Sequence, residues 1–379
     1  MMAEHLSRNP LRRIGRIQIG GMPSAEEGMP SVVRTRQRMI AFGIFIVSAL
    51  AFLYFVLPKV AGLSKTWDKL DQGDPAWLVA AFGFELLSFT GYVLLFRTIF
   101  ACEKPDRIDW TFSYQVTMAG VAATRLFAAA GSGGVALTVW ALRRAGIGPR
   151  TVAVRMAAFM ALLYFVYLGA LVIDGVLLRT GIVPGGGAFA ITIVPALLAG
   201  AIIAALLLLT LVPGDIERRL AAFARPTRRW GRLLTQLATM PALVGTGIRQ
   251  ALALVRAREI GLLGGIAWWA FDIAALWASF HAFGMAPQPA VIVMAYFVGT
   301  LGNLLPLPGG IGGVDGGMIG ALIAFNVDPG LAVVAVLTYR AFSFWLPTIP
   351  GGIAYLQLRR TVQHWQSGEA EGQVTPATA

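Results

Sequence analysis

Cysteine is almost absent from this 379-residue chain, and histidine is rare. The one cysteine, Cys102, excludes an internal disulfide and a cysteine-ligated metal or iron–sulfur site. The three histidines, His5, His281 and His364, lie far apart in the sequence. We therefore expect no metal centre and no bound cofactor.

Charged residues are also scarce. They make up 13% of the chain, against 57% hydrophobic residues, and the mean hydropathy is +0.70. Soluble domains have about 45–50% apolar and about 25% charged residues. The excess of apolar side chains must face lipid, so the composition predicts an all-α, polytopic membrane protein.

The net charge of +12 would also suit a nucleic-acid-binding protein. However, the basic residues lie in short segments between apolar runs, which is how membrane proteins set their orientation. No nucleic-acid-binding module accompanies them, so we expect no nucleic-acid partner.

Six apolar segments approach the roughly 20 residues that a membrane-crossing helix needs. They are 39–57, 76–98, 151–178, 188–212, 260–283 and 331–358. Two further stretches, 110–145 and 288–325, are interrupted by glycine-rich motifs near 130–134 and 306–313. The piece after each break has only about 12–15 residues, too few to cross about 30 Å of hydrocarbon. We predict two re-entrant helical hairpins there.

The basic residues select one topology. With the N-terminus inside, six spans and two hairpins place 25 of the 31 lysines and arginines in the cytoplasm, four outside and two within the membrane. A single crossing by 110–145 would instead put Arg143, Arg144, Arg150 and Arg155 outside, against the positive-inside bias. We predict a cell-membrane protein with both termini in the cytoplasm.

Three segments flank or interrupt the expected spans. The basic segment 1–38 and the polar segment 361–379 are expected to be mobile tails around a membrane domain at 39–360. Within that domain, 213–259 mixes apolar and basic positions at helical spacing. This pattern favours a helix in the inner headgroup layer, with a soluble loop helix as the alternative.

Matching positions indicate an internal repeat. They are Gly131–Val135 with Gly310–Val314, Gly120 with Gly299, and Phe84-Glu85 with Phe271-Asp272. Two units follow, 76–178 and 260–358, each made of a span, a hairpin and a span, and they begin on opposite sides of the membrane. Inverted repeats of this kind are typical of secondary transporters. Chance similarity between glycine-rich segments is the alternative.

Five ionisable residues fall near the middle of expected spans or hairpins: Glu85, Arg125, Asp272, Asp315 and Arg340. Each costs at least about 2.5–3.5 kcal/mol on insertion scales, so its presence needs a reason. The charges could join helices, for instance Glu85 to Arg125 and Asp272 to Arg340. Alternatively, the arginines could bind an anionic headgroup and the carboxylates a cationic group or a proton. The structural role and the ligand-binding role are compatible if the charge pairs open when substrate enters.

The glycine clusters are candidate headgroup sites. Each begins a half-helix whose free N–H groups and positive dipole end would lie within the membrane, a geometry that binds phosphate or carboxylate. The alternative is that the glycines only permit a sharp turn and close packing. The candidate substrate-binding residues are Arg125, Gly131, Gly133, Gly134, Asn303, Gly309, Gly310, Gly312, Gly313, Asp315 and Arg340; Glu85 and Asp272 are assigned to coupling or charge pairing.

The run from Asn303 to Asp315, followed by the run from Tyr339 to Pro347, resembles the membrane domain of lysylphosphatidylglycerol synthases and their stand-alone flippase-like relatives. The resemblance covers about 39–360 in layout and is specific over about 300–350. It implies lipid handling: the family's membrane domain moves aminoacylated phosphatidylglycerol between leaflets, and relatives are tied to polyprenyl-phosphate-linked lipids.

The sequence departs from the family in three ways. Asp315 stands where the family usually has glutamate, and the first hairpin lacks a proline often seen there. Only 19 residues follow Arg360, too few for the aminoacyl-transferase domain of the synthases. We therefore expect no lipid aminoacylation and no enzymatic activity.

The leading hypothesis is a flippase-like transporter for an anionic phospholipid, an aminoacylated phospholipid or a polyprenyl-phosphate-linked lipid. No nucleotide-binding P-loop motif is present, so a proton, ion or lipid gradient would drive it. Two alternatives remain: a polyprenyl-phosphate-dependent glycosyltransferase using Asp68, Asp71 or Asp74, and a non-catalytic partner of an envelope-synthesis enzyme. Membrane lipids are the expected partners, with a homo-oligomer or such an enzyme as further alternatives.

Overall fold

The computed structural model describes residues 72–126, 132–211, 229–304 and 310–374. Within these ranges all regular secondary structure is helical, and no strand occurs in them. Together with the apolar composition, this confirms the predicted all-α membrane fold.

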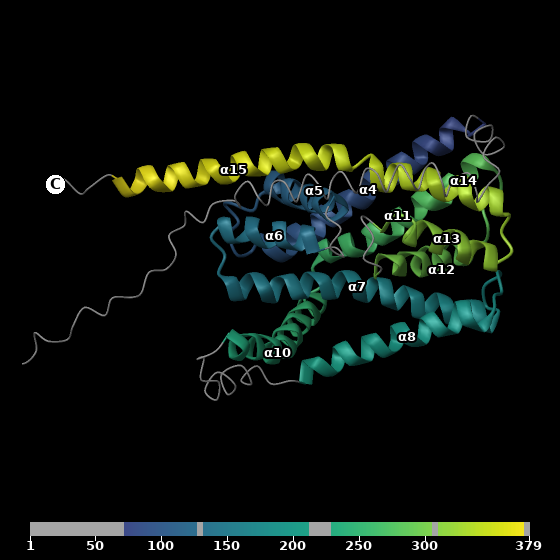
Figure 1. Cartoon of the computed structure of the whole chain (residues 1–379), viewed down its shortest axis with the longest axis horizontal. Helices are drawn as coiled ribbons and strands as arrows, with labels where there is room; N and C mark the ends of the chain where they lie inside the picture. The colour runs from purple at the N-terminus through teal and green to yellow at the C-terminus, as the bar shows by residue number, and fades with distance from the viewer. Residues whose placement is uncertain (1–71, 127–131, 212–228, 305–309, 375–379) are drawn as a thin grey trace, which may run out of the picture. The chain divides into compact units, whose positions relative to one another are not determined.

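Five helical segments are long and apolar enough to cross a membrane (Figure 1). They are α4 (Pro75–Phe100); α7 (Pro149–Thr180); α8 (Phe189–Leu208) with η3 (Leu209–Leu211); η4 (Ile260–Leu262) with α11 (Leu263–Phe283); and α14 (Pro329–Arg340), which continues through the π-helical turn η7 (Ala341–Trp345) towards α15 (Thr348–Val374). Five of the six expected spans are thus confirmed. The sixth, 39–57, lies outside the described residues.

Three of these helices begin at a proline, Pro75, Pro149 and Pro329, which suits the first helical position because the missing N–H would have no partner there. Asp74 and Asp328 precede two of them. Each carboxylate accepts a 2.8 Å hydrogen bond from a first-turn backbone N–H. The local sequence alone therefore sets where these helices start.

Both interrupted stretches form pairs of short helices, as predicted. The first pair is α5 (Trp110–Leu126) with α6 (Ser132–Arg144), and the second is α12 (Pro289–Thr300), extended by η5 (Leu301–Leu304), with α13 (Gly313–Ala324). At 13 and 12 residues, α6 and α13 are about 18–20 Å long, shorter than the hydrocarbon layer.

Glycines bring the two legs of each hairpin into backbone contact. A Cβ atom on Gly134 of α6 would lie 2.6 Å from the carbonyl oxygen of Gly120 in α5. A Cβ atom on Gly302 of η5 would lie 2.3 Å from the carbonyl carbon of Gly313 in α13. Any larger residue at these positions would separate the legs.

The two hairpins open at opposite ends of α4. Gly146 follows the first hairpin and Lys104 precedes it. A Cβ atom on Gly146 would lie 3.9 Å from the Lys104 side chain, so the two ends of this hairpin meet there, just beyond the C-terminus of α4. Gly284 precedes the second hairpin and Leu331 follows it. A Cβ atom on Gly284 would lie 3.7 Å from the Leu331 side chain, so the two ends of this hairpin also meet. Asp74 at the start of α4 lies at this second end, since its N–H donates to a carbonyl in the last turn of α11 at 2.8 Å.

Helices α4 and α11 run antiparallel along each other. The ring of Phe84 stacks on that of Phe271 at 6.1 Å between centroids. Beyond it, Gly91 approaches Gly264, where a Cβ atom would lie 2.3 Å from the Gly91 carbonyl oxygen. The pair Phe84 and Phe271, matched from the sequence as equivalent positions, therefore meets face to face.

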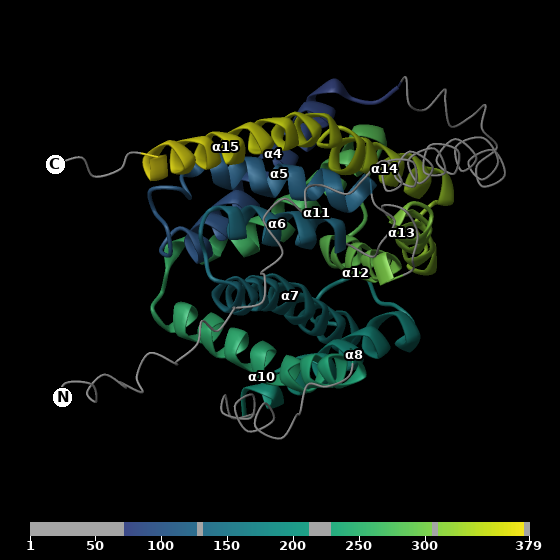
Figure 2. The ribbon, with the colours of Figure 1, turned by 60° about the vertical axis from the view of Figure 1, so that its left-hand side comes forward.

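Helix α15 packs along α5, and the two lie close together in Figure 2. Val362 is buried there, and the Trp365 ring lies 5.1 Å from that of Phe112. The expectation of a mobile tail from residue 361 is therefore wrong for 361–365, and the helix itself continues to Val374. Leu358, Val362 and Trp365 continue one apolar face at helical spacing, which keeps the helix bound.

Helix α10 (Arg229–Arg256) packs on α7 and η3. A Cβ atom on Gly247 would lie 2.5 Å from Ala157, and Arg249 Nη1 donates to the Thr210 carbonyl at 2.6 Å. These contacts hold its second half against the bundle. The placement of 213–259 in the headgroup layer stays a prediction.

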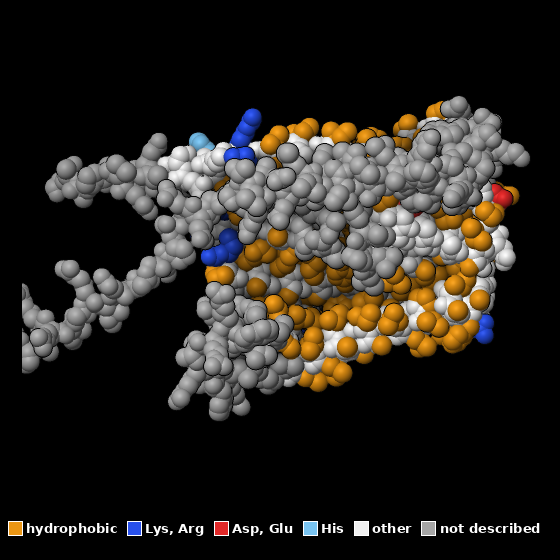
Figure 3. Space-filling model, in the orientation of Figure 1, with side chains coloured by type: hydrophobic (Ala, Val, Ile, Leu, Met, Phe, Trp, Pro, Cys, Tyr) orange, Lys and Arg blue, Asp and Glu red, His pale blue; other side chains and the backbone are white. Residues whose placement is uncertain are grey.

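The described surface carries many exposed apolar side chains. Figure 3 shows them spread over one face, with the visible Lys and Arg side chains towards its two ends. Leu197 of α8 and Ile173 of α7, for example, are 64% and 62% exposed. Such a surface suits contact with lipid tails.

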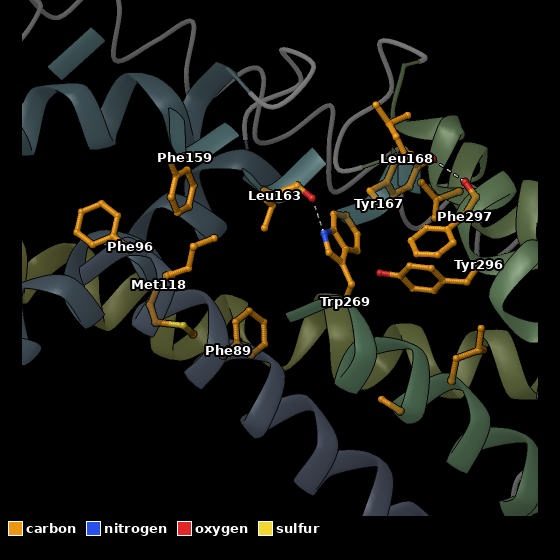
Figure 4. Close-up of a cluster of buried hydrophobic side chains, with 14 of the residues drawn as sticks. Phe89, Phe96, Met118, Phe159, Leu163, Tyr167, Leu168, Trp269, Tyr296 and Phe297 are labelled. Atoms are coloured by element: carbon orange, nitrogen blue, oxygen red, sulfur yellow. Dashed lines mark hydrogen bonds between the residues drawn. The ribbon is translucent and has the colours of Figure 1, made fainter. Parts of the chain in front are cut away.

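Aromatic side chains join α7, α11 and α12 inside the bundle (Figure 4). Trp269 Nε1 donates to the Leu163 carbonyl at 2.9 Å, and the Tyr167 hydroxyl donates to the Phe297 carbonyl at 2.8 Å. These bonds satisfy the polar atoms of buried rings and fix α11 and α12 against α7. They position the residues described next.

Candidate functional site

The five ionisable residues selected from the sequence come from five helices, α4, α5, α11, α13 and α14. Three of them are almost fully buried: Glu85 is 3% exposed, Asp315 4% and Asp272 8%. Direct contacts, described in turn below, tie each of the five into the bundle core.

Glu85 of α4 and Asp272 of α11 are joined by a hydrogen bond between their carboxyl groups. Asp272 also accepts hydrogen bonds from the hydroxyls of Tyr296 and Tyr339, the latter at 3.0 Å. The second oxygen of Glu85, Oε2, is buried and has no hydrogen-bond partner. A bond between two carboxyl groups requires a proton on one of them, so this pair holds at least one proton.

Asp315 connects the second hairpin to Arg340. As the third residue of α13, it accepts a hydrogen bond from the backbone N–H of Gly312 at 3.0 Å, which caps the helix. Its other oxygen lies 2.6 Å from Arg340 Nε. One carboxylate therefore occupies the positive end of a buried half-helix and neutralises an arginine.

Arg125 of α5 binds backbone rather than a carboxylate. Its guanidinium donates to the carbonyl oxygens of Ser343 and Phe344, the latter at 2.9 Å. Pro347 has no N–H, so the carbonyl four residues earlier, that of Ser343, loses its helical donor. The chain forms a π-helical turn at this point, and Arg125 supplies the missing donor.

The Phe344 ring contacts both arginines. Its ring centroid is 4.6 Å from the Arg340 guanidinium carbon and 5.3 Å from that of Arg125. Both distances fall within the range of cation–π attraction. A buried aromatic ring thus holds two positive charges near each other, one from each proposed repeat unit.

The charge pairs considered from the sequence were wrong in detail. Arg340 forms its ion pair with Asp315 rather than with Asp272, and Arg125 donates to carbonyls rather than to Glu85. Glu85 and Asp272 bond to each other instead. The reason is register: where α4 crosses α11, the two carboxyl groups come to the same level, and Asp315 at the tip of the second hairpin is nearer to Arg340.

The glycines of the second hairpin serve the turn. Gly310 and Gly312 have φ values of +68° and +80°, which side-chain-bearing residues rarely adopt. A Cβ atom on Gly310 would also lie 2.4 Å from the Asn303 side chain. Gly313 packs on η5 as described above, so the close-packing alternative accounts for all three. Gly309 lies outside the described residues.

In the first hairpin, Gly133 and Gly134 lie in the first turn of α6, and Gly134 contacts Gly120 and Thr124 of α5. Gly131 lies outside the described residues. The structure therefore does not decide whether this cluster binds a headgroup, and that assignment stays a prediction.

Three residues of the site were not selected from the sequence as site residues: Tyr296, Tyr339 and Phe344. Tyr339 and Phe344 lie within the motif that carries the family resemblance. A signal was present for the first two, since a tyrosine inside an apolar span needs a partner for its hydroxyl. The role of Phe344 had no such signal, because it depends on where two arginines meet.

The chain matches the sequence profile of the lysylphosphatidylglycerol synthase TM region over residues 40–351. The chain belongs to this family. Among curated relatives, a UPF0104 membrane protein of Methanothermobacter thermautotrophicus is 31% identical over 109 residues, 28% of this chain and 31% of the relative. A UPF0104 membrane protein of Methanocaldococcus jannaschii is 34% identical over 93 residues, 24% of this chain and 28% of the relative.

The matched regions thus span under a third of these relatives, so family membership rests on the profile. Membership agrees with the fold: the profile covers every described helix up to the start of α15. It also includes all five ionisable residues of the site.

Proposed function

We propose that this protein moves lipids with an anionic, phosphate-containing headgroup between the leaflets of a cell membrane. The observation that carries the proposal is the pair of arginines, Arg125 and Arg340, which both contact the Phe344 ring in the bundle core. Positive charge at membrane depth is costly, and phosphate is the ligand that two guanidinium groups suit best.

The arrangement of the hairpins supports a transport role. They open at opposite ends of α4, and their tip-side residues approach one central cluster, as in inverted-repeat transporters. In this proposal the hairpins are re-entrant and the repeat is inverted. The lipid headgroup passes between them while the acyl chains remain in the bilayer.

Charge pairing at the second hairpin suggests how the site works. Asp315 occupies the positions that a phosphate oxygen would take, at the N-terminus of α13 and beside Arg340. The headgroup displaces this carboxylate from Arg340 when it enters. The charges therefore act both as structural pairs and as ligands.

The glycosyltransferase alternative has less support. Of its three candidate acids, Asp74 caps α4 through Ala76 N, which is a structural role. Asp68 and Asp71 lie outside the described residues. A partner role in envelope synthesis is supported by no specific contact.

The test is lipid exchange in liposomes. Acyl-labelled fluorescent phosphatidylglycerol is placed in both leaflets, and a membrane-impermeant quencher reports how fast inner-leaflet lipid reaches the outside. We expect the wild-type protein to accelerate exchange of phosphatidylglycerol over that of a phosphate-free glycolipid with the same label. Arg340→Gln should abolish the difference, whereas Arg179→Gln, at the exposed end of α7, should preserve it. Equal rates with and without protein would refute the proposal.

A further inference from the structure

The pair of carboxyl groups on α4 and α11 is not explained by headgroup binding, because carboxylates repel phosphate. Glu85 and Asp272 are 3% and 8% exposed and bonded to each other. Oε2 of Glu85 has no hydrogen-bond partner although it is buried. A buried acceptor without a donor is costly unless something binds there during function.

The groups around the pair define its charge. Tyr296 of α12 and Tyr339 of α14 donate to Asp272 and hold it in place. The arginines that act electrostatically on Glu85 are Arg125 of α5 and Arg340 of α14. Asp315 of α13 is paired with Arg340.

Counting charges shows what the pair can do. The two arginines carry two positive charges, Asp315 carries one negative charge, and the carboxyl pair with one proton carries another, so the five residues are neutral together. A phosphodiester headgroup adds one negative charge. Because uncompensated charge in a low-dielectric core is strongly unfavourable, its entry favours the uptake of one proton.

We propose that Glu85 and Asp272 form a proton-binding site that takes up one proton when an anionic headgroup binds beside Arg125 and Arg340, which couples lipid movement to proton movement. The incoming proton forms an O–H bond with Oε2 of Glu85. The first proton, which Glu85 donates to Asp272 before uptake, moves along this hydrogen bond to Asp272, which then donates it to the other oxygen of Glu85. No bond other than these breaks or forms.

This inference rests on the proposed function, but its test separates the two. The purified protein in weakly buffered detergent solution is mixed with short-chain phosphatidylglycerol. Binding is followed calorimetrically, and proton uptake is followed with a pH-sensitive dye. We expect about one proton per bound lipid, so the apparent Kd should rise about tenfold for each pH unit over the range in which the pair must take up that proton.

Two variants locate the proton. The double variant Glu85→Gln, Asp272→Asn keeps the volume of both side chains and leaves no carboxyl group in the pair to take up a proton, so we expect its lipid-linked uptake to be lost. Asp174→Asn is the matched control, since Asp174 is a buried carboxyl with an unpartnered oxygen on α7, a helix that carries none of the five ionisable residues. We expect this control to take up a proton as the wild type does.

An infrared measurement gives a readout that does not depend on lipid. The wild type should show the carbonyl band of a protonated carboxyl group, and this band should be reduced in both Glu85→Gln and Asp272→Asn. Lipid binding without proton uptake, or uptake that survives in the double variant, would overturn the inference and leave the transport proposal intact. Failure of the wild type to bind lipid would overturn the transport proposal. Absence of the infrared band, which is measured without lipid, would show that the pair holds no proton and would overturn this inference.

Discussion

Asp315 and Arg340 form an ion pair at the tip of the second hairpin, with 2.6 Å between Oδ1 and Nε. The same carboxylate caps α13 through Gly312 N, so it fills the place where an anion would bind both a helix terminus and a guanidinium. The Asp315 carboxylate therefore occupies a position suited to binding an anion. That relationship makes the competition between Asp315 and a lipid phosphate testable.

Replacing Asp315 with asparagine should strengthen lipid binding. The amide oxygen can still accept the Gly312 N–H, while the negative charge that competes for Arg340 is lost. We expect the Kd for phosphatidylglycerol to fall about tenfold, which corresponds to about 1.4 kcal/mol. Calorimetric titration of the purified variant measures this, with Tm recorded in parallel. Asp328→Asn, which alters only the cap of α14, is the control and should leave Kd unchanged. Weaker binding in Asp315→Asn would show that the carboxylate assists the headgroup rather than competing with it.

Replacing Pro347 with alanine should disturb the site without unfolding the protein. Alanine restores an N–H that can bond to the Ser343 carbonyl, so the π-helical turn can revert to α-helix and Arg125 loses an acceptor. We expect lipid exchange to fall about tenfold while Tm is unchanged or higher. Pro195→Ala, at a proline inside α8, is the matched control and should exchange lipid normally. Unchanged exchange in Pro347→Ala would mean that the position of Arg125 does not depend on the turn.

The crossing of α4 and α11 should tolerate no side chain at Gly264. A Cβ atom there would lie 2.3 Å from the Gly91 carbonyl oxygen and 2.8 Å from Leu95 N, both backbone atoms that cannot move aside alone. We expect Gly264→Ala to cost about 1–3 kcal/mol and to lower Tm clearly. Gly83→Ala tests the same change on α4 at a position with no atom within 4 Å, and it should be neutral or gain up to about 1 kcal/mol. Similar Tm values for both variants would contradict the close crossing.

The orientation of the hairpins can be tested by labelling. In a Cys102→Ser background, single cysteines replace Arg144, which follows the first hairpin, and Asp328, which follows the second. Both positions are exposed. Since the hairpins open at opposite ends of α4, we expect an impermeant maleimide to label the two cysteines from opposite sides of the membrane, Arg144→Cys from the cytoplasm. Labelling of both from one side would exclude the inverted repeat.

Much of the helical framework could be predicted from the sequence, because its causes are local. Five spans, both glycine breaks and the helix starts at Pro149 and Pro329 follow from runs of apolar residues and from the backbone limits of glycine and proline. The continuation of α15 past residue 361 was missed. Its cause is the packing of Val362 and Trp365 on α5, which is not local.

The sequence by itself determined which ionisable residues fall within apolar segments, because a charge in an apolar run stands out without any knowledge of its neighbours. Only the tertiary structure decided their partners: Glu85 with Asp272, Asp315 with Arg340, and Arg125 with the carbonyls of Ser343 and Phe344. Partner choice depends on how α4 crosses α11 at Gly91 and on how far the second hairpin reaches. The crossing and the reach of the hairpin are set by contacts between residues far apart in the chain. Hydropathy and residue spacing carry no information about such contacts.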